Sequence, residues 1–449
     1  MRASRRTATK RRKWAWPVCL WLWLLGLSLP APAQELATET PGDVLLLPER
    51  MWTGEGDAVY EGWAVRVHEG VIVAVGPRAA VDAPPGVRRI ELPGATLTPG
   101  LIDLHAHLFL HPYDETSWND QVLTEAQDYR TLEAAAHARA TLRAGFTTLR
   151  DLGTEGAGFA DVAVKHAIEQ GLIPGPRLFV ATRAIVATAS YGPGPRGFRP
   201  DLALPGGAQE VSGVDQAMAA VREQAARGAD WIKLYADYRV GPDGATVPTF
   251  TAAELKAIVE TAHLLGRPVA AHAASDAGVR MAAEAGVDSI EHGYGASAAT
   301  FRLLAQKGIA YQPTLTAVIA TETYFHHYRP GIDPPTPRIE EAMHALERAL
   351  AAHVTVGNGS DVGVFAHGDN WREPAAMVAA GMTPVQALHA ATDVAARILR
   401  QQDRFGRIAP GLRADLAAFA GMPDRHIEAL ARPLLVMKDG TLFRTPAQP

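Results

Sequence analysis

The centre of this chain, roughly residues 98–401, alternates between two kinds of segment. Short apolar runs recur at 101–105, 146–150, 178–181, 231–235, 268–272, 287–292, 309–312 and 353–357. Alanine-rich stretches with helical spacing separate them, and two of these begin with helix-start signals, at residues 251–254 and 383–386. Eight strands alternating with helices predict an α/β fold, the (β/α)8 or TIM barrel. A doubly wound open sheet is the alternative, and the number of strand-and-helix units favours the barrel.

Both flanks of this centre have a different pattern. From residue 43 to about residue 97, short apolar runs alternate with turn residues, and β-branched residues are frequent. A similar pattern returns at 416–419 and at 434–437, where the turn 438–440 follows. Such segments predict short antiparallel strands. We therefore predict a small β-sandwich domain built from both chain ends, residues 40–97 plus 402–446, beside a barrel domain of residues 98–401.

The first 33 residues predict an export signal peptide. Basic residues crowd positions 2–13, an apolar run follows at 14–29, and residues 31–33 form a small-residue cleavage site. Pro17 breaks the apolar run, which is short for a membrane-spanning helix, although an uncleaved membrane anchor is the alternative. Export through the general or the twin-arginine route would give a periplasmic or secreted protein without stable membrane association.

The only cysteine of the chain, Cys19, lies inside this signal. A mature chain that begins near Gln34 would contain no cysteine, which excludes disulfides, thiolate metal ligands and a cysteine nucleophile. The net charge of −5 and the lack of a basic stripe after residue 13 give no reason to expect a nucleic-acid partner. We expect a small-molecule substrate, and assembly into a homo-oligomer is left open.

Side chains that can bind metal stand at the ends of several predicted strands. Residues i and i+2 of a strand point to the same face, so two histidines one residue apart project together. Barrel enzymes carry their catalytic groups at the C-terminal ends of the strands. A core histidine, a helix-capping aspartate or a lysine that reaches solvent would explain any one of these residues alone. His105 and His107 together predict half of a metal site. The coincidence of His105, His107, Lys233, His272, His292 and Asp361 at one face predicts a functional site there.

These side chains, together with segments 99–107, 359–361 and 406–416, resemble the amidohydrolase superfamily. The resemblance covers nearly all of the chain after the signal peptide. It implies a barrel with a β-sandwich and two divalent metal ions, usually zinc, bridged by a carboxylated lysine and a hydroxide. On this resemblance His105, His107 and Asp361 hold one metal, His272 and His292 hold the other, and Lys233, as N6-carboxylysine, bridges them.

The chemistry of this set is consistent with hydrolysis. An amine buried in an apolar strand has a lowered pKa, so Lys233 can lose its proton, capture carbon dioxide and become an anionic ligand. Two close metal ions lower the pKa of the bridging water and polarise a substrate carbonyl. Asp361, beside the hydroxide, would carry the proton to the leaving amine.

The resemblance also separates reaction classes. Superfamily members with a single metal, such as deaminases and imidazolonepropionase, usually lack the lysine, and the glutamate that deaminases carry shortly after the histidine at position 272 is absent. Segments 111–118, 149–154 and 367–370 resemble secreted dipeptidase-type members, which cleave N-acyl amino acids and Xaa-Pro, Xaa-Arg/Lys or Xaa-aromatic dipeptides and include hydrolases of ochratoxin A. We predict hydrolysis of the amide bond of dipeptides or N-acyl amino acids, ochratoxin A-type N-acyl-phenylalanine among them. A lactonase or esterase on the same binuclear centre, or a mononuclear deaminase-like enzyme, is the alternative.

Position in the predicted barrel suggests which residues face the substrate. Tyr235 shares a strand face with Lys233 and could donate its hydroxyl to the scissile carbonyl or to a product carboxylate, although it could also be a packed tyrosine. Arg196, or Arg183 before it, could bind a terminal carboxylate through its fork of donors, with a surface arginine as the simpler alternative. The candidates supplied by loops are Tyr191, Arg196, His327 and His367.

Two further classes receive little support. The chain contains no Gly-x-Ser-x-Gly nucleophile elbow, which a serine hydrolase of the α/β type would need. A non-catalytic binding protein on the same scaffold would be expected to have lost some of the metal ligands, and all six positions are intact.

Overall fold

The computed structural model describes residues 42–194, 197–199 and 201–446. The predicted signal peptide and Arg196 lie outside these ranges. Within them, no helix is both long enough and apolar enough to cross a membrane.

Every predicted apolar run of the centre except the last forms a parallel strand. These strands are β6 (Leu101–Ala106), β7 (Phe146–Asp151), β8 (Arg177–Val180), β11 (Ile232–Tyr235), β14 (Val269–Ala273), β15 (Ser289–His292) and β16 (Ala310–Gln312). Most of their side chains are buried, because helices cover parallel strands, and this is why the runs are continuously apolar. The sequence pattern does not predict four short strands, β9 (Ile185–Ala187), β10 (Gln209–Val211), β12 (Asp237–Tyr238) and β13 (Val247–Pro248).

The parallel strands form two sheets in which neighbours follow the order of the chain, except that the short β10 lies at an edge, outside β9. One has the order β6-β7-β8 and the other β10-β9-β11-β14-β15-β16. The backbone N–H of Asp230 donates to the carbonyl of Val180 at the end of β8, at 2.8 Å, which links the two sheets. The segment 353–362, which contains the last predicted strand at 353–357, makes isolated bridges instead of a regular strand. One bridge joins it to Tyr311 of β16 and another joins it to Ala106 of β6.

Glycine lets this last segment approach its neighbours closely. A Cβ atom at Gly359 would lie 2.9 Å from Cβ of Gln312 and 3.0 Å from Cβ of His105. Any other residue would force β16 and β6 apart. The glycine therefore allows the chain that carries Asp361 to lie between these two strands.

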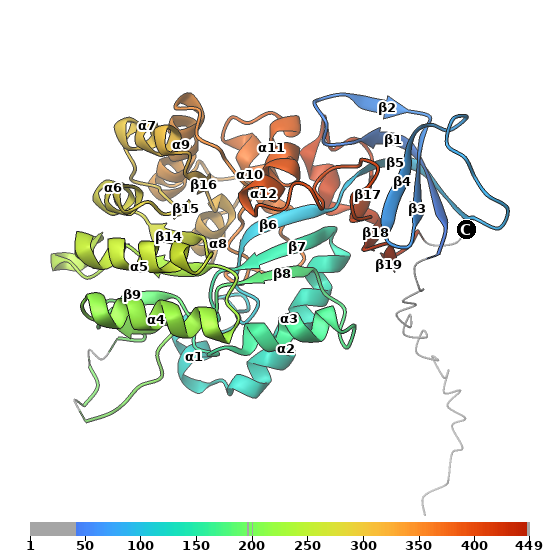
Figure 1. The fold of residues 1–449 in the computed structure, drawn as a ribbon. Helices are drawn as coiled ribbons and strands as arrows, with labels where there is room; N and C mark the ends of the chain where they lie inside the picture. The colour runs from blue at the N-terminus through green and yellow to red at the C-terminus, as the bar shows by residue number, and fades with distance from the viewer. Residues whose placement is uncertain (1–41, 195–196, 200, 447–449) are drawn as a thin grey trace, which may run out of the picture. The chain divides into compact units, whose positions relative to one another are not determined.

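Helices follow the strands along the chain. They are α1 (Trp118–Thr124), α2 (Gln127–Arg143), α3 (Ala160–Glu169), α4 (Val214–Arg227), α5 (Ala252–Leu264), α6 (Asp276–Ala285), α7 (Ala298–Lys307), α8 (Leu315–His326), α9 (Pro337–Ala351), α10 (Arg372–Ala379), α11 (Pro384–Ala390) and α12 (Asp393–Ile398), with 3-10 turns at Pro242–Gly244 and Ile427–Ala431. Both predicted capping boxes are confirmed, at Thr251 with Glu254 and at Thr383 with Gln386. Helices α4 to α7 lie side by side along the second sheet (Figure 1) and bury their apolar faces against it.

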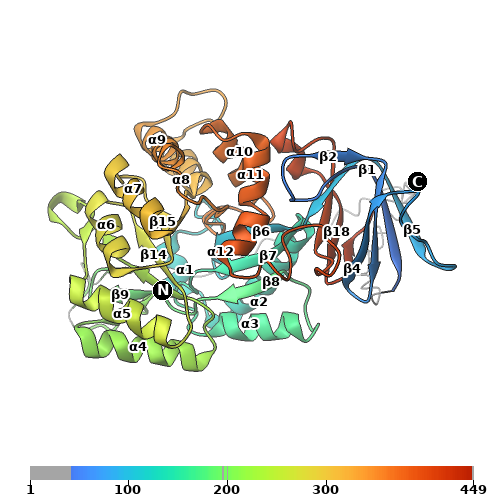
Figure 2. The same ribbon diagram turned by 45° about the horizontal axis from the view of Figure 1, so that its top comes forward.

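Both chain ends contribute strands to one further sheet. Its order is β19-β18-β17-β5-β1-β3-β4, with β2 paired to β1. The strands are β1 (Val44–Trp52), β2 (Val59–Glu61), β3 (Trp63–His68), β4 (Val71–Pro77), β5 (Arg88–Pro99), β17 (Leu416–Ala420), β18 (Pro433–Lys438) and β19 (Thr441–Arg444). In Figure 2 the red β18 of the C-terminal part lies in the same sheet as the blue strands of the N-terminal part, and β17 between them pairs with β5. The antiparallel pairing of Leu416 with Pro99 places the start of β6 beside this sheet.

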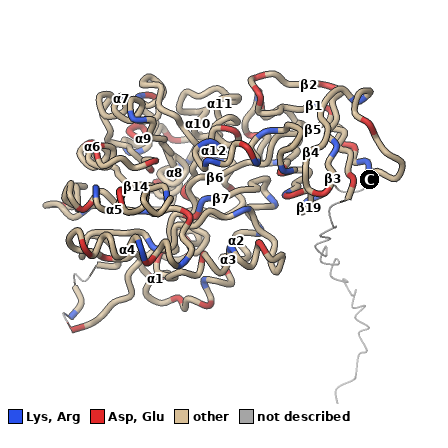
Figure 3. The backbone as a smooth tube through the Cα atoms, in the orientation of Figure 1, with Lys and Arg blue, Asp and Glu red and all other residues tan. Residues whose placement is uncertain are grey.

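Charged residues of both signs are interspersed along the described chain (Figure 3). Several of them pair across large sequence distances, as Arg50 does with Asp424 at 2.8 Å. Ion pairs of this kind connect the N-terminal strands of the terminal sheet to the segments around its C-terminal strands.

Candidate metal centre

His105 and His107, at the end of β6, direct their Nε2 atoms to a common point. His105 donates from Nδ1 to the carboxylate of Glu291 at 2.9 Å, and His107 donates from Nδ1 to the carbonyl of Gly153 at 2.9 Å. The opposite nitrogens, Nε2, lie 3.5 Å and 3.3 Å from the same Oδ1 of Asp361. Because Nδ1 is used in a hydrogen bond, Nε2 is the nitrogen that remains for a metal. The structure thus brings these three predicted residues together, as ligand atoms within 4.8 Å of one another.

Asp361 is held in place by its backbone. Its N–H donates to the carbonyl of His105 at 2.8 Å, and its φ of 62° lies in the left-handed region that few non-glycine residues adopt. Burial would raise the pKa of Asp361, but the facing imidazoles of His105, His107 and His292 outweigh it and hold the pKa well below its usual range. Asp361 is therefore a carboxylate ready to act as an oxygen ligand.

Burial lowers the pKa of His107, but the hydrogen bond with Asp361 and the charge of Glu155 outweigh this effect and raise it to about 9. A metal ion bound at Nε2 would have to displace that proton. Metal affinity at this position should consequently weaken as the pH falls.

His272 and His292 project from the neighbouring strands β14 and β15. Their ring centroids lie 4.5 Å apart, and the ring of His292 lies 5.1 Å from that of His105. Nδ1 of His292 lies 2.8 Å from the hydroxyl oxygen of Thr314, which itself donates to a backbone carbonyl, so the imidazole is the donor. Burial lowers the pKa of His272 well below its usual value and that of His292 to about 4. Both rings are therefore neutral, as metal ligands must be.

Lys233, on β11, is fully buried at the same end of the sheet. Among the described residues its Nζ has no hydrogen-bond partner. Burial lowers the pKa of this amine to about 8, so about a tenth of it is neutral at pH 7, far more than for an ordinary lysine. A buried, unpartnered and readily deprotonated amine has the properties that carbamate formation requires.

A cavity of about 630 Å³ opens onto these side chains. His107, His272, His292 and Asp361 form part of its wall. Much of the remaining wall is aromatic and consists of Tyr113, Tyr191, Tyr235, Tyr238 and Tyr294. A cavity of this volume is large enough for a small organic substrate.

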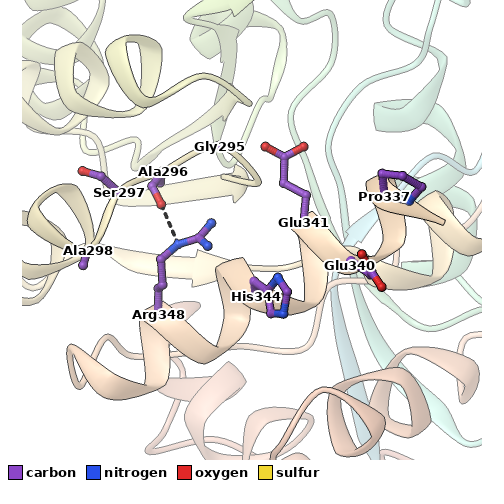
Figure 4. A pocket seen from close by; sticks show the side chains of 9 residues that line it. All are labelled: Gly295, Ala296, Ser297, Ala298, Pro337, Glu340, Glu341, His344 and Arg348. Atoms are coloured by element: carbon purple, nitrogen blue, oxygen red, sulfur yellow. Dashed lines mark hydrogen bonds between the residues drawn. The ribbon is translucent and has the colours of Figure 1, made fainter. Parts of the chain in front are cut away.

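A more open hollow lies next to this cavity, between residues 295–298 and α9 (Figure 4). Arg348 of α9 donates to the carbonyl of Ala296 at 2.9 Å and to that of Tyr294 at 2.9 Å, which fixes the loop after β15 to the helix. Gly295 and Glu341 line both the hollow and the cavity, so α9 borders the two of them.

Two of the residues predicted to face substrate line the cavity, Tyr191 and Tyr235. Their hydroxyl oxygens lie 3.3 Å apart, and the ring of Tyr235 stacks on that of His272 with centroids 4.3 Å apart. Burial raises the pKa of both tyrosines well above its usual value, so both hydroxyls stay protonated and can donate hydrogen bonds.

The structure does not bring the other described candidates into the cavity wall. His327 is exposed at the C-terminal end of α8. His367 lies behind the wall, with Nε2 3.1 Å from the carbonyl oxygen of Leu110 and its ring stacked on His137 at 4.3 Å. Arg183 pairs with Glu223 at 3.4 Å. Each of these side chains is positioned by tertiary contacts that a loop sequence does not reveal.

Sequence reasoning missed the groups that orient the predicted ligands. Glu291 receives the hydrogen bond of His105, and Arg150 donates to the same carboxylate at 2.9 Å. Asp103 accepts from the side chains of Ser360 and Asn370, which positions the segment before Asp361. The sequence did contain a signal for these groups, because each is a charged residue inside an otherwise apolar strand. Asp103 lies in β6, Arg150 in β7 and Glu291 in β15. Glu155 and Arg239 of the cavity wall had no such signal, because they lie in loops.

Comparison with known proteins agrees with this geometry. The model of the amidohydrolase family matches residues 96–443. An uncharacterized protein of Mycobacterium tuberculosis is 32% identical over 368 residues, which are 78% of this chain and 86% of that protein. The ochratoxinase of Aspergillus niger is 28% identical over 438 residues, which are 90% of this chain and 86% of that enzyme.

A solved structure extends the similarity to the whole fold. The crystal structure of a Xaa-Pro dipeptidase with methionine bound in its active site matches with a TM-score of 0.80 and 30% identity, and covers 89% of this chain and 99% of the dipeptidase. The strand-and-helix arrangement is accordingly TIM-barrel-like, and the family generally uses divalent metal ions. This chain therefore belongs to the amidohydrolase family and is a hydrolase that acts on amide bonds.

Proposed function

We propose that this enzyme uses two divalent metal ions, most simply zinc, to hydrolyse the amide bond of dipeptides or N-acyl amino acids. One observation carries the proposal: four buried or nearly buried imidazoles, a carboxylate and an unpartnered buried amine meet where five parallel segments end. In the proposed assignment, His105, His107 and Asp361 bind one metal, His272 and His292 bind the other, and Lys233 bridges the two as N6-carboxylysine.

The donor set supports a pair of metals. Hydrogen bonds at Nδ1 leave Nε2 of His105, His107 and His292 facing inward, the arrangement that metal-binding histidines adopt. Burial of the unpartnered Nζ of Lys233 costs free energy, because the amine has lost its hydrogen bonds to water. A carbamate formed on this amine and bound to cations would remove that cost. When bound, two divalent ions would lower the pKa of a water molecule and polarise the scissile carbonyl.

The protein's own groups would handle the proton and the product. Asp361, ionised and next to both β6 histidines, would accept a proton from the attacking water and pass it to the leaving amine. Tyr235 keeps its proton and lines the cavity, so its hydroxyl would donate to the scissile carbonyl or to a product carboxylate. Burial of both groups excludes competing water, which strengthens these interactions.

The shape and lining of the cavity support a dipeptide-sized substrate. A volume of about 630 Å³ accommodates two amino-acid residues or an aromatic acyl group with one residue. Its tyrosine-rich wall suits an apolar or aromatic side chain. The names of the similar proteins, a Xaa-Pro dipeptidase and an ochratoxinase, support the same class, and ochratoxin A-type N-acyl-phenylalanine belongs to the proposed range.

We extend the proposal to the architecture and the location. The strands pair in chain order as β6-β7-β8 and β9-β11-β14-β15-β16, with only the short β10 outside β9. This order, and bridges from segment 353–362 to both β16 and β6, support a closed barrel of residues 98–401 over a doubly wound sheet. Pairing of β5 with β17 supports a composite β-sandwich of residues 40–97 plus 402–446. The basic and apolar pattern of the first 33 residues supports export and cleavage near Ala33.

One experiment tests the function. The chain from Gln34 onward is purified, its metal content is measured, and it is assayed against matched panels of dipeptides, N-acyl amino acids and lactones. Amide hydrolysis that a chelator abolishes and zinc restores supports the proposal. Metal-dependent turnover of lactones alone would replace it with an esterase of the same centre, and a protein that purifies without metal and hydrolyses nothing would refute it.

A further inference from the structure

Glu155 is a buried acidic residue in the cavity wall to which the proposed hydrolysis gives no role. It follows β7, and its side chain and backbone together are only 2% exposed. Its φ of 48° is unusual for a glutamate, and Arg130 fixes the backbone by donating to its carbonyl at 2.7 Å. The surrounding chain therefore holds this carboxylate in one place.

The two carboxylate oxygens of Glu155 have different surroundings. Oε2 accepts hydrogen bonds from the indole of Trp118 at 3.1 Å and from the hydroxyl of Tyr191 at 2.7 Å. Oε1 is buried and has no hydrogen-bond partner among the described residues. The nearest cationic group is Nδ1 of His107 at 3.9 Å, but that nitrogen donates to Gly153 instead.

No lysine or arginine side chain in residues 42–194, 197–199 and 201–446 forms an ion pair with this carboxylate. Arg130 contacts the backbone carbonyl and not the side chain. A buried carboxylate with one unsatisfied oxygen is unfavourable unless a cation or a donor completes it. Oε1 is therefore an acceptor without a donor among the described residues, on a side chain that lines the cavity from which a substrate group would approach it.

Aromatic rings surround this carboxylate. The ring centroid of Tyr191 lies 4.6 Å from that of Tyr235, 5.0 Å from that of Tyr238 and 5.1 Å from that of Trp118. The faces of such rings attract cations, and a ring cluster with one carboxylate is a general solution for binding ammonium and guanidinium groups. Arg239 already lies over the ring of Tyr238, 5.6 Å from its centroid, and Nζ of Lys233 lies 5.4 Å from that of Tyr235. Tyr191, whose hydroxyl donates to Glu155, is therefore the ring that remains for a cation from outside the chain.

We propose that Glu155, with the ring of Tyr191 beside it, forms a subsite for a cationic group of the substrate. This inference rests on the proposed amide hydrolysis, because it names which substrates of that class are preferred. The cation has two sources, the free α-ammonium of a dipeptide and the basic side chain of a lysine or arginine residue. In either case a cationic substrate is hydrolysed faster than its uncharged isostere.

The test compares wild type with Glu155→Gln on two matched substrate pairs. Alanyl-phenylalanine against propionyl-phenylalanine isolates the α-ammonium, and alanyl-lysine against alanyl-norleucine isolates the basic side chain. Glu347→Gln is the control, since Glu347 is exposed on α9 and is not part of the cavity wall. Thermal unfolding of each variant checks that it is folded.

We expect Glu155→Gln to lower kcat/KM for the cationic member of one pair by about tenfold or more, and to change its neutral partner by less than about threefold. The affected pair identifies the source of the cation, and Glu347→Gln should not alter the ratio of kcat/KM values in either pair. Equal changes in both members of both pairs would overturn the subsite and leave Glu155 as a support for Trp118 and Tyr191.

Wild type alone provides a second measurement in case the variant fails to fold. A preference of about tenfold for the cationic member of one pair supports the subsite, and equal kcat/KM within both pairs overturns it. If metal-loaded wild type hydrolyses no member of either pair and no other amide, the proposed function fails and the subsite fails with it. If amides are hydrolysed without a charge preference, only the subsite fails.

Discussion

Glu291 offers the sharpest test of how this centre is held together. It is fully buried on β15, and its carboxylate accepts from Nδ1 of His105 at 2.9 Å, from Arg150 at 2.9 Å and from Ser289 at 2.6 Å. Glu291→Gln preserves the size of the side chain and removes its charge. The change should weaken metal binding, because His105 loses the anionic acceptor that fixes its ring and its tautomer.

The magnitude follows from the contacts that are lost. A hydrogen bond to a charged group contributes about 1.5–3 kcal/mol, and each 1.4 kcal/mol corresponds to about tenfold in an equilibrium constant. We therefore expect zinc affinity at this position, and kcat/KM with it, to fall by about 10–100-fold. Arg150 would keep a buried charge without its partner, which should lower the free energy of unfolding by about 3–5 kcal/mol.

Competition with a chromogenic chelator measures the metal affinity, and amide hydrolysis at saturating zinc measures the remaining activity. Glu347→Gln, at an exposed position of α9, is the matched control and should change neither quantity. Assays are run well below the unfolding midpoint of the variant, so that lost stability is not counted as lost affinity. Wild-type metal affinity in folded Glu291→Gln would refute the reasoning, because it would mean that His105 needs no anionic partner.

Three further predictions concern single residues. Lys233→Ala should purify with less metal and lose hydrolysis, and acetate should partly restore activity by replacing the carbamate; near-native turnover without acetate would rule out the carbamate. Asp361→Asn should lower kcat by about 10²–10⁴-fold even when metal is saturating, since an amide cannot carry the proton; an unchanged kcat would assign the proton to another group. Burial raises the pKa of Glu373 to about 8, whereas it is near 4.5 in an unfolded chain, so the stabilisation that its protonated form provides should decline as the pH rises from about 5 to about 8. Unfolding midpoints of wild type should therefore fall relative to those of Glu373→Gln over that range, and a constant difference would contradict the raised pKa.

Much of the fold could be predicted from the sequence because local patterns reflect it directly. Continuous apolar runs at 101–105 and 231–235 became β6 and β11, since strands covered by helices bury both faces. Capping residues such as Thr251 and Thr383 predicted where helices begin, because their side chains bind neighbouring backbone groups. The segment 353–362 departs from the prediction, since its glycines and close contacts leave only isolated bridges.

Within the site, the sequence by itself determined which residues stand at strand ends, and only the tertiary structure decided what each of them faces. The i, i+2 spacing of His105 and His107 follows from strand geometry, whereas their contacts with Glu291 and Gly153 join strands that are far apart in the chain. The surroundings of Glu155 likewise exist only because its loop meets Trp118 of α1 and the loop of Tyr191, while one of its oxygens is left without a partner. Periodicity constrains the direction of a side chain within its own element, but burial, hydrogen bonding and pKa depend on neighbours that folding brings together.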